Sequence, residues 1–549
     1  MRTPVREQKL LYGWREPPVP IPAATVLLVR DGPGGLELLM TRRSLRASFA
    51  PGAYVFPGGR VDEQDHAVAR AAGVAEPQVG DEAYRIAAIR EAFEELGVLF
   101  ARRETGRLVD QARIDQLDRD PGRSLAAQLQ AAGLTLARDQ LHWFSHWITD
   151  RDLPRRFDTR FFIARMPEGQ QPVADETEQF APEWVVPAHG LARYERGEFN
   201  IIFPTIRTLR QLKDFSNTDQ LLDWIQGERE MWRSSPRAGH LRGDIARFCE
   251  NEPPFGELEL VSPDGSIRHT LDWQHEPVRL LHHVTRITAP NPGRMTGPGT
   301  NTYVIGEPGG YLVVDPGPDI DEHVARIADL VGQDLKAIVC THSHPDHYPG
   351  AKPLRERLGL PAVPILGRPS GPLFNPAWPF TPDRVLEDGE ILTIGDTRIK
   401  VLHTPGHASN HVCLLLEQDR LLVSGDHILN GSTTVVDHPD GNMKAYIDSL
   451  HRLAGEDIAY ILPAHGYVLG RAKHEIEALI RHRLRREAKV LAALASIGQG
   501  SLDELVLLAY DDVDPILHPV AKRSLAAHLH KLAEDGKASV HGDRWRISH

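Results

Sequence analysis

Short apolar runs separated by turns fill the first 235 residues of the chain and predict an α/β fold. The stretch "AATVLLVRDGPGGLELLMTRR", residues 23–43, predicts two strands joined by a Gly/Pro turn, which is a hairpin. "AYRIAAIREAFEELG" predicts a helix, "RRFDTRFFIARMP" a strand, and "EWVVPAHGLARY" a strand that runs into a helix. We therefore expect one α/β domain over residues 20–235.

Turn-forming residues separate this block from a second one. "SSPRAGHLRG" and "NEPPFG" are rich in Ser, Pro and Gly, so residues 236–275 are predicted to be a linker. From residue 276 onward, short strands such as "GYLVVDPG", "KAIVCTH" and "RLLVSGDH" alternate with helical segments and end in Asp, His or Gly. Functional residues at strand ends are typical of an α/β scaffold. This pattern predicts a second domain at residues 276–484.

The C-terminal pattern predicts a small winged-helix-like domain at residues 485–549. A long helix is expected at about 471–496, and Ser501 and Glu504 have the spacing of a capping box for the next helix. "KASVHGDRWRIS" near the end of the chain predicts a hairpin. Between these elements, one helix face is apolar at Leu525, Leu529 and Leu532.

Composition restricts the class of protein. Of the 549 residues 41% are hydrophobic and 25% charged, and no run of about 18 apolar residues is present, so we expect a cytoplasmic protein without a membrane partner. The three cysteines, Cys249, Cys340 and Cys413, form no CxxC pair, which argues against a disulfide framework and cysteine zinc fingers. The net charge of -12 argues against a wholly basic nucleic-acid coat. The oligomeric state stays open.

Many of the 27 histidines lie after residue 340, and this clustering indicates metal or acid/base chemistry. "THSHPDH" follows an apolar strand. Residues two apart in an extended chain face the same way, so His342 and His344 can bind one ion while Asp346 and His347, past a Pro turn, face another. Three more candidates stand at strand ends, namely His407, Asp426 and His465.

With "VVDPG", which contains Asp315, these segments resemble the ordered motifs of the metallo-β-lactamase fold, an αββα sandwich. The resemblance implies one Zn²⁺ on His342, His344 and His407, a second on Asp346, His347 and His465, and Asp426 bridging the two. Such a pair lowers the pKa of a shared water toward about 7, for attack on a carbonyl or phosphorus centre. Asp346 is the candidate proton shuttle.

The sequence that flanks these motifs points to one subgroup of this fold family. "APNPGRMTGPGTNTYVIG", "GDHILNGSTTVV" and "HRLRREAKVL" resemble the β-lactamase-like group whose better-known members are endoribonucleases acting on single-stranded RNA, over roughly residues 280–549. Related folds hydrolyse thioesters with the same metal pair. Residues 471–549 hold 13 Lys plus Arg against 11 Asp plus Glu, whereas a nucleic-acid face is usually clearly basic. Both single-stranded RNA and an acyl thioester therefore stay open as substrates.

A second candidate site lies in the first domain, in "REAFEELG". Glu91, Glu94 and Glu95 stand at i, i+3 and i+4, on one side of a helix, where like charges repel unless a cation lies among them. Arg90 is placed to orient Glu91. A solvated helix face is the alternative interpretation of the same pattern.

"REAFEELGV" matches the second half of the Nudix box, G-x5-E-x7-R-E-U-x-E-E-x-G-U, in which the helix binds Mg²⁺ or Mn²⁺ and the metals polarise a diphosphate. Counting back eight residues from Arg90 reaches Glu82 as the first Glu of the box. The gap from Gly59 to Glu82 then contains an insertion of 17 residues, which we expect to be an external loop. The resemblance implies an α/β/α fold and the metal ligands Glu82, Glu91, Glu94 and Glu95.

An interrupted box of this kind resembles the Nudix branch that includes peroxisomal coenzyme A diphosphatases. The CoA-associated signature LLTxR[SA]x3Rx3Gx3FPGG is partly present, and it implies that Arg43, Gly58 and Gly59 contact a CoA-like ligand. Ser48 stands where the signature has its second arginine, with Arg46 two residues earlier. In "DETEQFAPEW", the candidates for a base or a further metal ligand are Glu178 and Glu176, which as loop carboxylates also fit simple exposure.

Taken together, the motifs predict a bifunctional metallohydrolase with a Nudix diphosphatase domain and a dinuclear zinc domain. In one version both sites act on acyl-CoA-like molecules. In another the zinc site cuts RNA while the Nudix site clears nucleotide derivatives. In a third the Nudix domain only senses a nucleotide or CoA, and the zinc domain is an acyl thioesterase.

Overall fold

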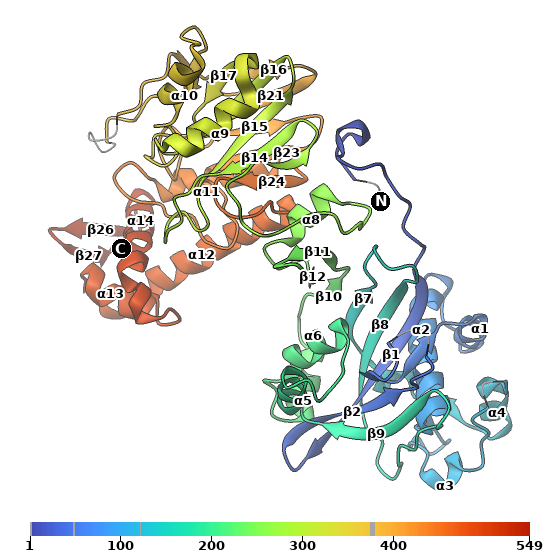
Figure 1. The fold of residues 1–549 in the computed structure, drawn as a ribbon. Helices are drawn as coiled ribbons and strands as arrows, with labels where there is room; N and C mark the ends of the chain where they lie inside the picture. The colour runs from blue at the N-terminus through green and yellow to red at the C-terminus, as the bar shows by residue number, and fades with distance from the viewer. Residues whose placement is uncertain (1–2, 48–49, 121, 374–378, 549) are drawn as a thin grey trace. The chain divides into compact units, whose positions relative to one another are not determined.

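The computed structural model describes residues 3–47, 50–120, 122–373 and 379–548 (Figure 1). They divide into two compact units, Pro17–Pro236 and a unit made of Met1–Glu16 with Arg237–His549. The N-terminal segment belongs to the second unit because Val5 and Leu10 are buried in its core. Among the described residues no helix has the length and apolar character needed to cross a membrane.

The unit Pro17–Pro236 is built on a mixed sheet with the strand order β10-β7-β8-β1-β2-β3, to which β4 adds on β1 and β9 on β2. Strands β1 (Ile21–Gly32) and β2 (Gly35–Arg43) form the predicted hairpin, with Gly32 opposite Gly35. Helix α2 (Glu76–Leu96) lies on one side of this sheet and α5 (Pro187–Glu195) and α6 (Phe203–Leu212) on the other (Figure 1). The α/β/α prediction is confirmed. The other elements are β3 (Tyr54–Val55), β4 (Gly58–Arg60), α1 (Glu63–Ala71), β5 (Ala101–Arg102), α3 (Gln111–Ile114), α4 (Leu125–Ala131), β6 (Thr135–Leu136), β7 (His142–Ile148), β8 (Phe157–Arg165), β9 (Gln179–Val185), α7 (Thr218–Gln226) and β10 (Trp232–Ser234).

The insertion in the Nudix box is helical, whereas the sequence predicted an external loop. It contains α1 and the first turns of α2, and a capping box between Asp62 and Asp65 starts α1. Asp65 is 1% exposed and binds Arg90 of α2, with Nε–Oδ1 and Nη2–Oδ2 distances of 3.1 Å. A buried ion pair therefore fixes α1 against the helix that carries the glutamates. A small apolar core supports the same contact, formed by Ala69, Val79 and Ile86.

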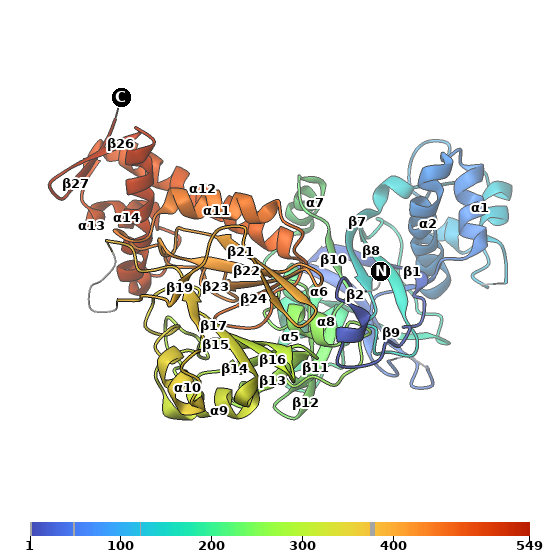
Figure 2. The same ribbon diagram turned by 90° about the horizontal axis from the view of Figure 1, so that it is seen from above.

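Residues 278–463 form two packed sheets with helices on both outer faces, the predicted αββα sandwich (Figure 2). The first sheet contains β13 (Val278–Leu281), β14 (Val284–Thr288), β15 (Asn301–Glu307), β16 (Gly310–Val314), β17 (Leu335–Val339), β18 (Ile365–Gly367) and β19 (Arg384–Val385). The second contains β20 (Ile391–Ile394), β21 (Thr397–His403), β22 (Val412–Leu416), β23 (Leu421–Gly425) and β24 (Tyr460–Pro463).

Alternation along these strands fills three apolar layers, because successive side chains point to opposite faces of a sheet. Leu312 and Val314 face the core between the sheets, while Val313 faces α9 (Asp321–Val331) and α10 (Ala351–Leu358). In the second sheet, Leu414 faces the inner core and Cys413 faces the helices α11 (Met443–Ala454) and α12 (Ala472–Ile497). The strands are buried on both sides, which explains their nearly continuous apolar sequences.

Helix α12 continues from the sandwich into the winged-helix domain. This domain contains α13 (Leu502–Ala509), α14 (His518–Glu534) and a sheet of β25 (Gln499–Gly500), β27 (Arg544–Ile547) and β26 (Ala538–His541). The predicted capping box at the start of α13 is confirmed, with the Glu504 carboxylate 2.8 Å from the Ser501 amide. The predicted apolar face of α14 is fully buried at Leu525, Leu529 and Leu532.

Residues 236–275, expected to be a linker, carry ordered elements of the second unit. They form the hairpin β11 (Arg237–Leu241) and β12 (Asp244–Phe248), followed by α8 (Phe255–Val261). Glu257 of α8 is fully buried and accepts hydrogen bonds from Arg286 (Nη2–Oε1, 3.1 Å) and from the Val468 amide (3.2 Å). A Cβ on Gly256 would lie 2.1 Å from the Gly470 nitrogen, so only glycine permits this contact between α8 and the loop after β24. Local turn propensity gave no sign of this tertiary packing.

We expect Glu257→Gln to destabilise the second unit by about 3–5 kcal/mol, because it leaves the Arg286 guanidinium buried without its counter-charge. Burial alone raises the pKa of Glu257, but Arg286 and His269 outweigh burial and lower it to about 2. A depressed carboxyl pKa stabilises the fold above the unfolded value near 4.5, and this stabilisation is lost as pH falls toward 2. Urea unfolding of the full chain should therefore show a gap between wild type and variant that is largest at neutral pH and shrinks below about pH 4.5.

The control for this prediction is Asp244→Asn on β12 of the same unit. Asp244 is exposed, so its replacement should cost less than about 0.5 kcal/mol. Equal costs for the two variants, or a gap that stays constant with pH, would contradict the assigned role of the buried pair.

Candidate metal centres

Seven His and Asp side chains converge at the carboxyl ends of β17, β21, β23 and β24. The loop after β17 carries four of them, and the other three strands contribute one each from the loop that follows. Their ligand atoms form two groups, each with all atoms within 4.8 Å of one another. The first group contains His342, His344, His407 and Asp426, and the second Asp346, His347 and His465. The structure thus brings all seven of these residues together, with Asp426 in the first group.

Asp426 lies between the two groups. Its Oδ1 is 3.5 Å from His347 Nε2 and 3.3 Å from His465 Nε2, while its Oδ2 is 3.6 Å from His407 Nε2. Two atoms bound to one tetrahedral zinc at about 2.0–2.1 Å lie roughly 3.3 Å apart. Asp426 Oδ1 and His347 Nε2 are buried and lack hydrogen-bond partners, a costly arrangement that a cation between them would relieve. The donor set therefore fits two divalent cations with Asp426 shared.

Neighbouring groups orient the histidines by holding their other ring nitrogen. His347 Nδ1 lies 2.9 Å from Asp315 Oδ2, and His407 Nδ1 donates to the Val435 carbonyl at 2.7 Å. His465 Nδ1 donates to the Gly299 carbonyl at 3.2 Å. These contacts leave Nε2 of each ring facing the centre, and such outer partners are known to tune metal affinity.

The charges differ between the two groups. Burial lowers the pKa of His344 to about 3 and that of His342 well below its usual value, so both are neutral ligands. Burial also lowers the pKa of His465, but Asp426 and Asp346 outweigh it and raise the pKa to about 10. The second group therefore concentrates carboxylate charge, and a divalent cation would compete with protons for it.

Several supporting residues were not predicted from the sequence. Thr300 donates from Oγ1 to Asp346 Oδ2 at 3.3 Å, and the Asp426 amide donates to His411 Nε2 at 3.2 Å. Asp315, noted only as part of a motif, accepts from both the amide and the hydroxyl of Thr341 at 2.7 Å, besides its contact with His347. The motif around Asp315 was the only available signal, because the other contacts are tertiary.

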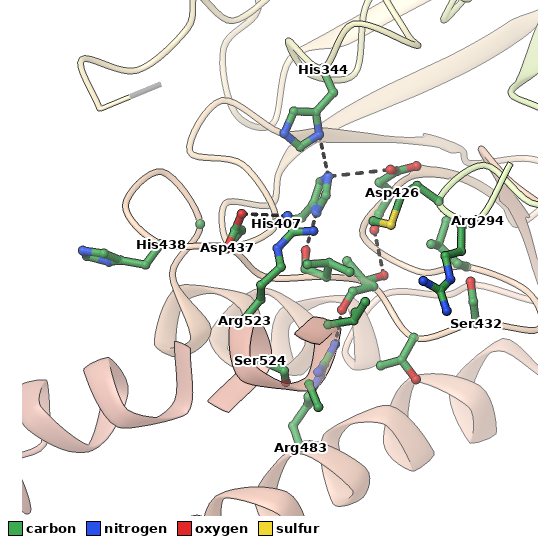
Figure 3. Close-up of a pocket in the computed structure, with 18 of the residues that line it drawn as sticks. Arg294, His344, His407, Asp426, Ser432, Asp437, His438, Arg483, Arg523 and Ser524 are labelled. Carbon is green, nitrogen blue, oxygen red and sulfur yellow. Dashed lines mark hydrogen bonds and ion pairs between the residues drawn. The ribbon is translucent and has the colours of Figure 1, made fainter. Parts of the chain in front are cut away.

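Five of the seven metal residues line a pocket of about 710 Å³, a volume typical of ligand sites, namely His344, Asp346, His407, Asp426 and His465. His344, His407 and Asp426 contribute from the sandwich, while Arg483 and the α14 residues Arg523 and Ser524 line the wall formed by α12 and the winged-helix domain (Figure 3). Arg294 and Ser432 line the same pocket (Figure 3). The wall also contains apolar side chains from both parts, including Met295, Leu373, Leu429, Val435, Val513, Leu517, Val520 and Ala521.

A second pocket, of about 1060 Å³, contains the carboxylates of α2. Glu95 is 6% exposed and accepts hydrogen bonds from the Gly58 amide and from Gln179 Nε2, both at 2.9 Å. Burial raises the pKa of Glu95 to about 8 and that of Glu91 to about 7. A Cβ on Gly59 would lie 2.3 Å from Glu91 Oε1, so any larger residue here would move the Glu91 carboxylate. Carboxylates this close and this buried form a site that suits a cation.

Arg90 is the cation already present among these carboxylates. Its Nη1 lies 2.8 Å from Glu91 and 3.0 Å from Glu94, as the predicted orienting role requires. The same guanidinium is held from the other side by Asp65.

Glu82 does not join this site, contrary to the prediction from the box. It pairs with Arg85 at 2.6 Å and Arg138 at 3.2 Å, and it lines a different pocket. Counting the box forward from Gly59 shows why: the acid six residues later is Asp65, which binds Arg90. The insertion of 17 residues therefore lies after the first acid of the box rather than before it.

The remaining predicted residues of this site are close to the carboxylates. Arg43 and Glu178 both line the pocket, and Arg43 Nε is buried without a hydrogen-bond partner. Arg46 lines the pocket too, whereas Glu176 is not part of its lining. Ser48, the position of the missing signature arginine, lies outside the described residues.

Comparison with known proteins agrees with this division of the chain. The family model "Metallo-beta-lactamase superfamily" matches residues 295–465, "Beta-lactamase associated winged helix domain" matches residues 501–545, and "NUDT19 Nudix domain" matches residues 67–212.

Two of the similar curated proteins are 31% identical to this chain. One is the "Beta-lactamase-like protein 2 homolog" of Drosophila melanogaster, over 272 residues that cover 48% of this chain and 91% of that protein. The other is "Atrochrysone carboxyl ACP thioesterase nsrC" of Aspergillus novofumigatus, over 46% of this chain and 79% of that protein.

Two solved structures are also similar. A NUDIX hydrolase from Alicyclobacillus acidocaldarius is 30% identical, with a TM-score of 0.33, and the match covers 37% of this chain and 96% of that one. A metallo-beta-lactamase family protein from Thermus thermophilus is 24% identical, with a TM-score of 0.42, over 49% of this chain and all of that one.

The chain belongs to the metallo-β-lactamase superfamily and carries a Nudix domain and a β-lactamase-associated winged helix in addition. Both catalytic families are hydrolases, so the protein is a hydrolase whose families bind divalent metals.

Proposed function

We propose that this protein is a bifunctional metal-dependent hydrolase in which the site around Asp426 hydrolyses an acyl thioester and the Nudix site cleaves a CoA-like nucleoside diphosphate derivative. The observation that carries the proposal is Asp426 itself, with one carboxylate oxygen toward each ligand group. We assign two Zn²⁺ to these groups, because imidazole and carboxylate ligands in this number suit zinc. Mg²⁺ or Mn²⁺ is assigned to the all-carboxylate Nudix site.

Two zinc ions bound at this site would supply a water of lowered pKa and positive charge facing the developing oxyanion. Asp346 is the group placed to accept the proton of the attacking water. Its Oδ2 is 3.4 Å from both His347 Nε2 and His465 Nε2, and Thr300 holds the same oxygen. Burial raises the pKa of Asp346, but the neighbouring His347 and His465 outweigh burial and hold the pKa below its usual value, so the carboxyl is ionised.

An acyl thioester fits the pocket better than RNA does. The wall beside the metal residues combines apolar side chains with arginines, as an acyl group joined to a polar carrier requires. Several similar proteins are named thioesterases that act on an acyl carrier protein. Single-stranded RNA would need stacking aromatic side chains, and Tyr510 is the one Phe, Tyr or Trp among the described residues that line this pocket.

In the Nudix site, Glu91, Glu94 and Glu95 would hold the divalent ions, and Arg43 is placed to bind a phosphate oxygen. The buried Nε of Arg43 without a partner supports this role, because guanidinium groups bind phosphate through paired donors. Glu178 at the same pocket is our candidate for the base that activates water. We propose residues 20–235 as the catalytic Nudix domain.

Purified protein incubated with acyl-CoA and, separately, with single-stranded RNA tests the zinc-site assignment. We expect free thiol release from acyl-CoA in a zinc-dependent reaction, lost on dialysis against a chelator and restored by Zn²⁺, with RNA left intact. Chelation should lower activity by about a hundred-fold or more, because the water loses its activating ions. RNA cleavage without thioester hydrolysis would favour a nuclease and overturn the assignment.

A sensor role for the Nudix domain is the main alternative. The carboxylates Glu91, Glu94 and Glu95 surround one pocket with Arg90, which argues for turnover rather than binding alone. Tight binding of CoA with no diphosphate cleavage in Mg²⁺ or Mn²⁺ would establish the sensor role.

A further inference from the structure

We infer that the winged-helix domain forms the acyl-binding wall of the metal pocket and so determines which acyl chain lengths the enzyme accepts. This inference rests on the proposed thioesterase function and gives its C-terminal domain a direct part in substrate selection. The occupant of the wall is the apolar chain of the acyl group whose thioester carbonyl lies at the metal residues.

The pocket is shared between the sandwich and the C-terminal domain. Tyr510 and Val513 follow α13, Leu517 precedes α14, and Val520 and Ala521 lie on its first turn. The same cavity reaches His344, Asp346 and Asp426. An acyl group bound at the metal residues would therefore extend toward residues 510–521.

Large apolar side chains are exposed at this pocket. Met295 is 52% exposed, Leu373 61% and Leu517 42%, although side chains of this kind are usually buried. All three line the pocket, two from the sandwich and one from the winged-helix domain. Exposed apolar groups gathered around a cavity mark a site for an apolar ligand.

The three arginines that α12 and α14 contribute to this pocket are already engaged by the protein. Arg486 Nη1 donates to the Ala509 carbonyl at 2.7 Å and binds Asp512 at 2.8 Å. Arg523 Nη2 lies 2.7 Å from Asp437, and Arg483 donates to the Thr434 carbonyl. A backbone of phosphates would have to displace these partners, whereas an acyl chain leaves them in place.

The same contacts fix the position of this pocket wall relative to the metal residues. Arg483 and Arg523 bind the loop at residues 434–437, and Val435 in that loop accepts the hydrogen bond from the ring of His407. Asn442 Nδ2 also donates to Glu534 of α14 at 2.8 Å. The winged-helix domain and a metal-site histidine therefore share one supporting loop, as a wall of the active site requires.

Val520→Trp tests the inference, because Val520 lines the pocket and an indole side chain at this position can extend into the cavity. We expect kcat/KM for octanoyl-CoA and palmitoyl-CoA to fall about ten-fold or more, with acetyl-CoA hydrolysis within about two-fold of wild type and zinc content unchanged. Ala521→Leu is a smaller change at the adjacent position and should reduce palmitoyl-CoA hydrolysis first. The matched control is Leu507→Trp on α13, which is 62% exposed and does not line the pocket.

A second measurement does not depend on turnover. Calorimetry measures the binding of non-hydrolysable S-alkyl-CoA thioethers to the zinc-loaded full chain. Wild type should bind the hexadecyl thioether more tightly than the ethyl one, and Val520→Trp should remove that preference. Equal losses for every chain length, or the same losses in Leu507→Trp, would overturn the inference. If the wild-type protein hydrolyses no acyl-CoA, the proposed thioesterase function is wrong. If, in addition, thioether binding does not depend on chain length, the inference that the winged-helix domain binds the acyl chain is wrong as well. RNA cleavage impaired by Val520→Trp would assign the wall to RNA instead.

Discussion

Asp426→Asn is expected to lower kcat/KM for acyl-CoA hydrolysis by about a thousand-fold or more, because one substitution removes a ligand and its negative charge from both metal groups. In the structure the two oxygens of Asp426 face His347 and His465 on one side and His407 on the other. An amide would turn an NH₂ group toward one of these sides, where it cannot bind a cation. Zinc measured by mass spectrometry should fall from two ions per chain to one or fewer.

Asp448→Asn is the control for this variant, since Asp448 is exposed on α11. It should keep both ions and wild-type activity. The Nudix reaction of Asp426→Asn should also be unchanged, which shows that the loss is confined to the unit that contains Asp426. Two bound zinc ions together with near wild-type thioester hydrolysis in Asp426→Asn would contradict the bridging role.

Glu95→Gln is expected to lower diphosphate cleavage by a factor on the order of 10² to 10⁴ while leaving thioester hydrolysis intact. Glu95 accepts from the Gly58 amide and from Gln179, and its carboxyl lines the same pocket as that of Glu91. Glutamine cannot become the anion that binds a divalent ion, and it offers an NH₂ where an acceptor is needed. Cleavage of CoA in Mg²⁺, followed by chromatography of the two products, measures the loss.

Glu82→Gln is the control for this prediction. Counting the Nudix box back from Arg90 assigns Glu82 to the metal site, whereas the structure places Glu82 outside that site. Glu82 pairs with Arg85 and Arg138 at another pocket. Its replacement should change diphosphate cleavage by no more than about two- to three-fold, as is usual for a partly exposed ion pair. If Glu82→Gln lowers diphosphate cleavage as much as Glu95→Gln does, Glu82 belongs to the metal site. Asp65→Asn should be the more harmful change, because it frees one side of the buried Arg90.

The metallo-β-lactamase site could be predicted residue by residue because its ligands follow strands. "KAIVC" is a buried strand, and the residues after it, from His342 to His347, must lie at the end of a sheet. His407, Asp426 and His465 follow further strands in the same way. The strand pattern thus predicted that all seven side chains lie at strand ends, while their division between two ions came from the resemblance to the metallo-β-lactamase motifs.

The Nudix site could be predicted only in part, because a motif with an insertion can be counted from either end. The helix predicted the positions of Glu91, Glu94 and Glu95 by its period. The acid that binds Arg90 depends on where α1 packs, and the sequence contained two acids, Asp65 and Glu82, at the permitted spacings. Only the structure, in which Asp65 is buried against Arg90, shows that Asp65 is the acid that binds this arginine.

Features that rest on long-range packing had no sequence signal. Residues 236–275 look like turns and Pro-rich spacers, yet Glu257 of α8 forms a buried ion pair with Arg286 of β14. The pocket wall from α14 could not be predicted either, because Val520 and Ala521 belong to no motif and line the same pocket as the metal residues only once the C-terminal domain has packed. The predictions therefore stopped at the metal ligands, while substrate recognition depends on the surrounding fold.

The most direct test of the central claim is anomalous diffraction from crystals of the full chain grown with Zn²⁺. We predict two zinc peaks in the sandwich, one beside His342, His344 and His407 and the other beside Asp346, His347 and His465, with Asp426 bound to both. A single ion that does not contact Asp426, or no anomalous signal there at saturating zinc, would contradict a dinuclear hydrolase.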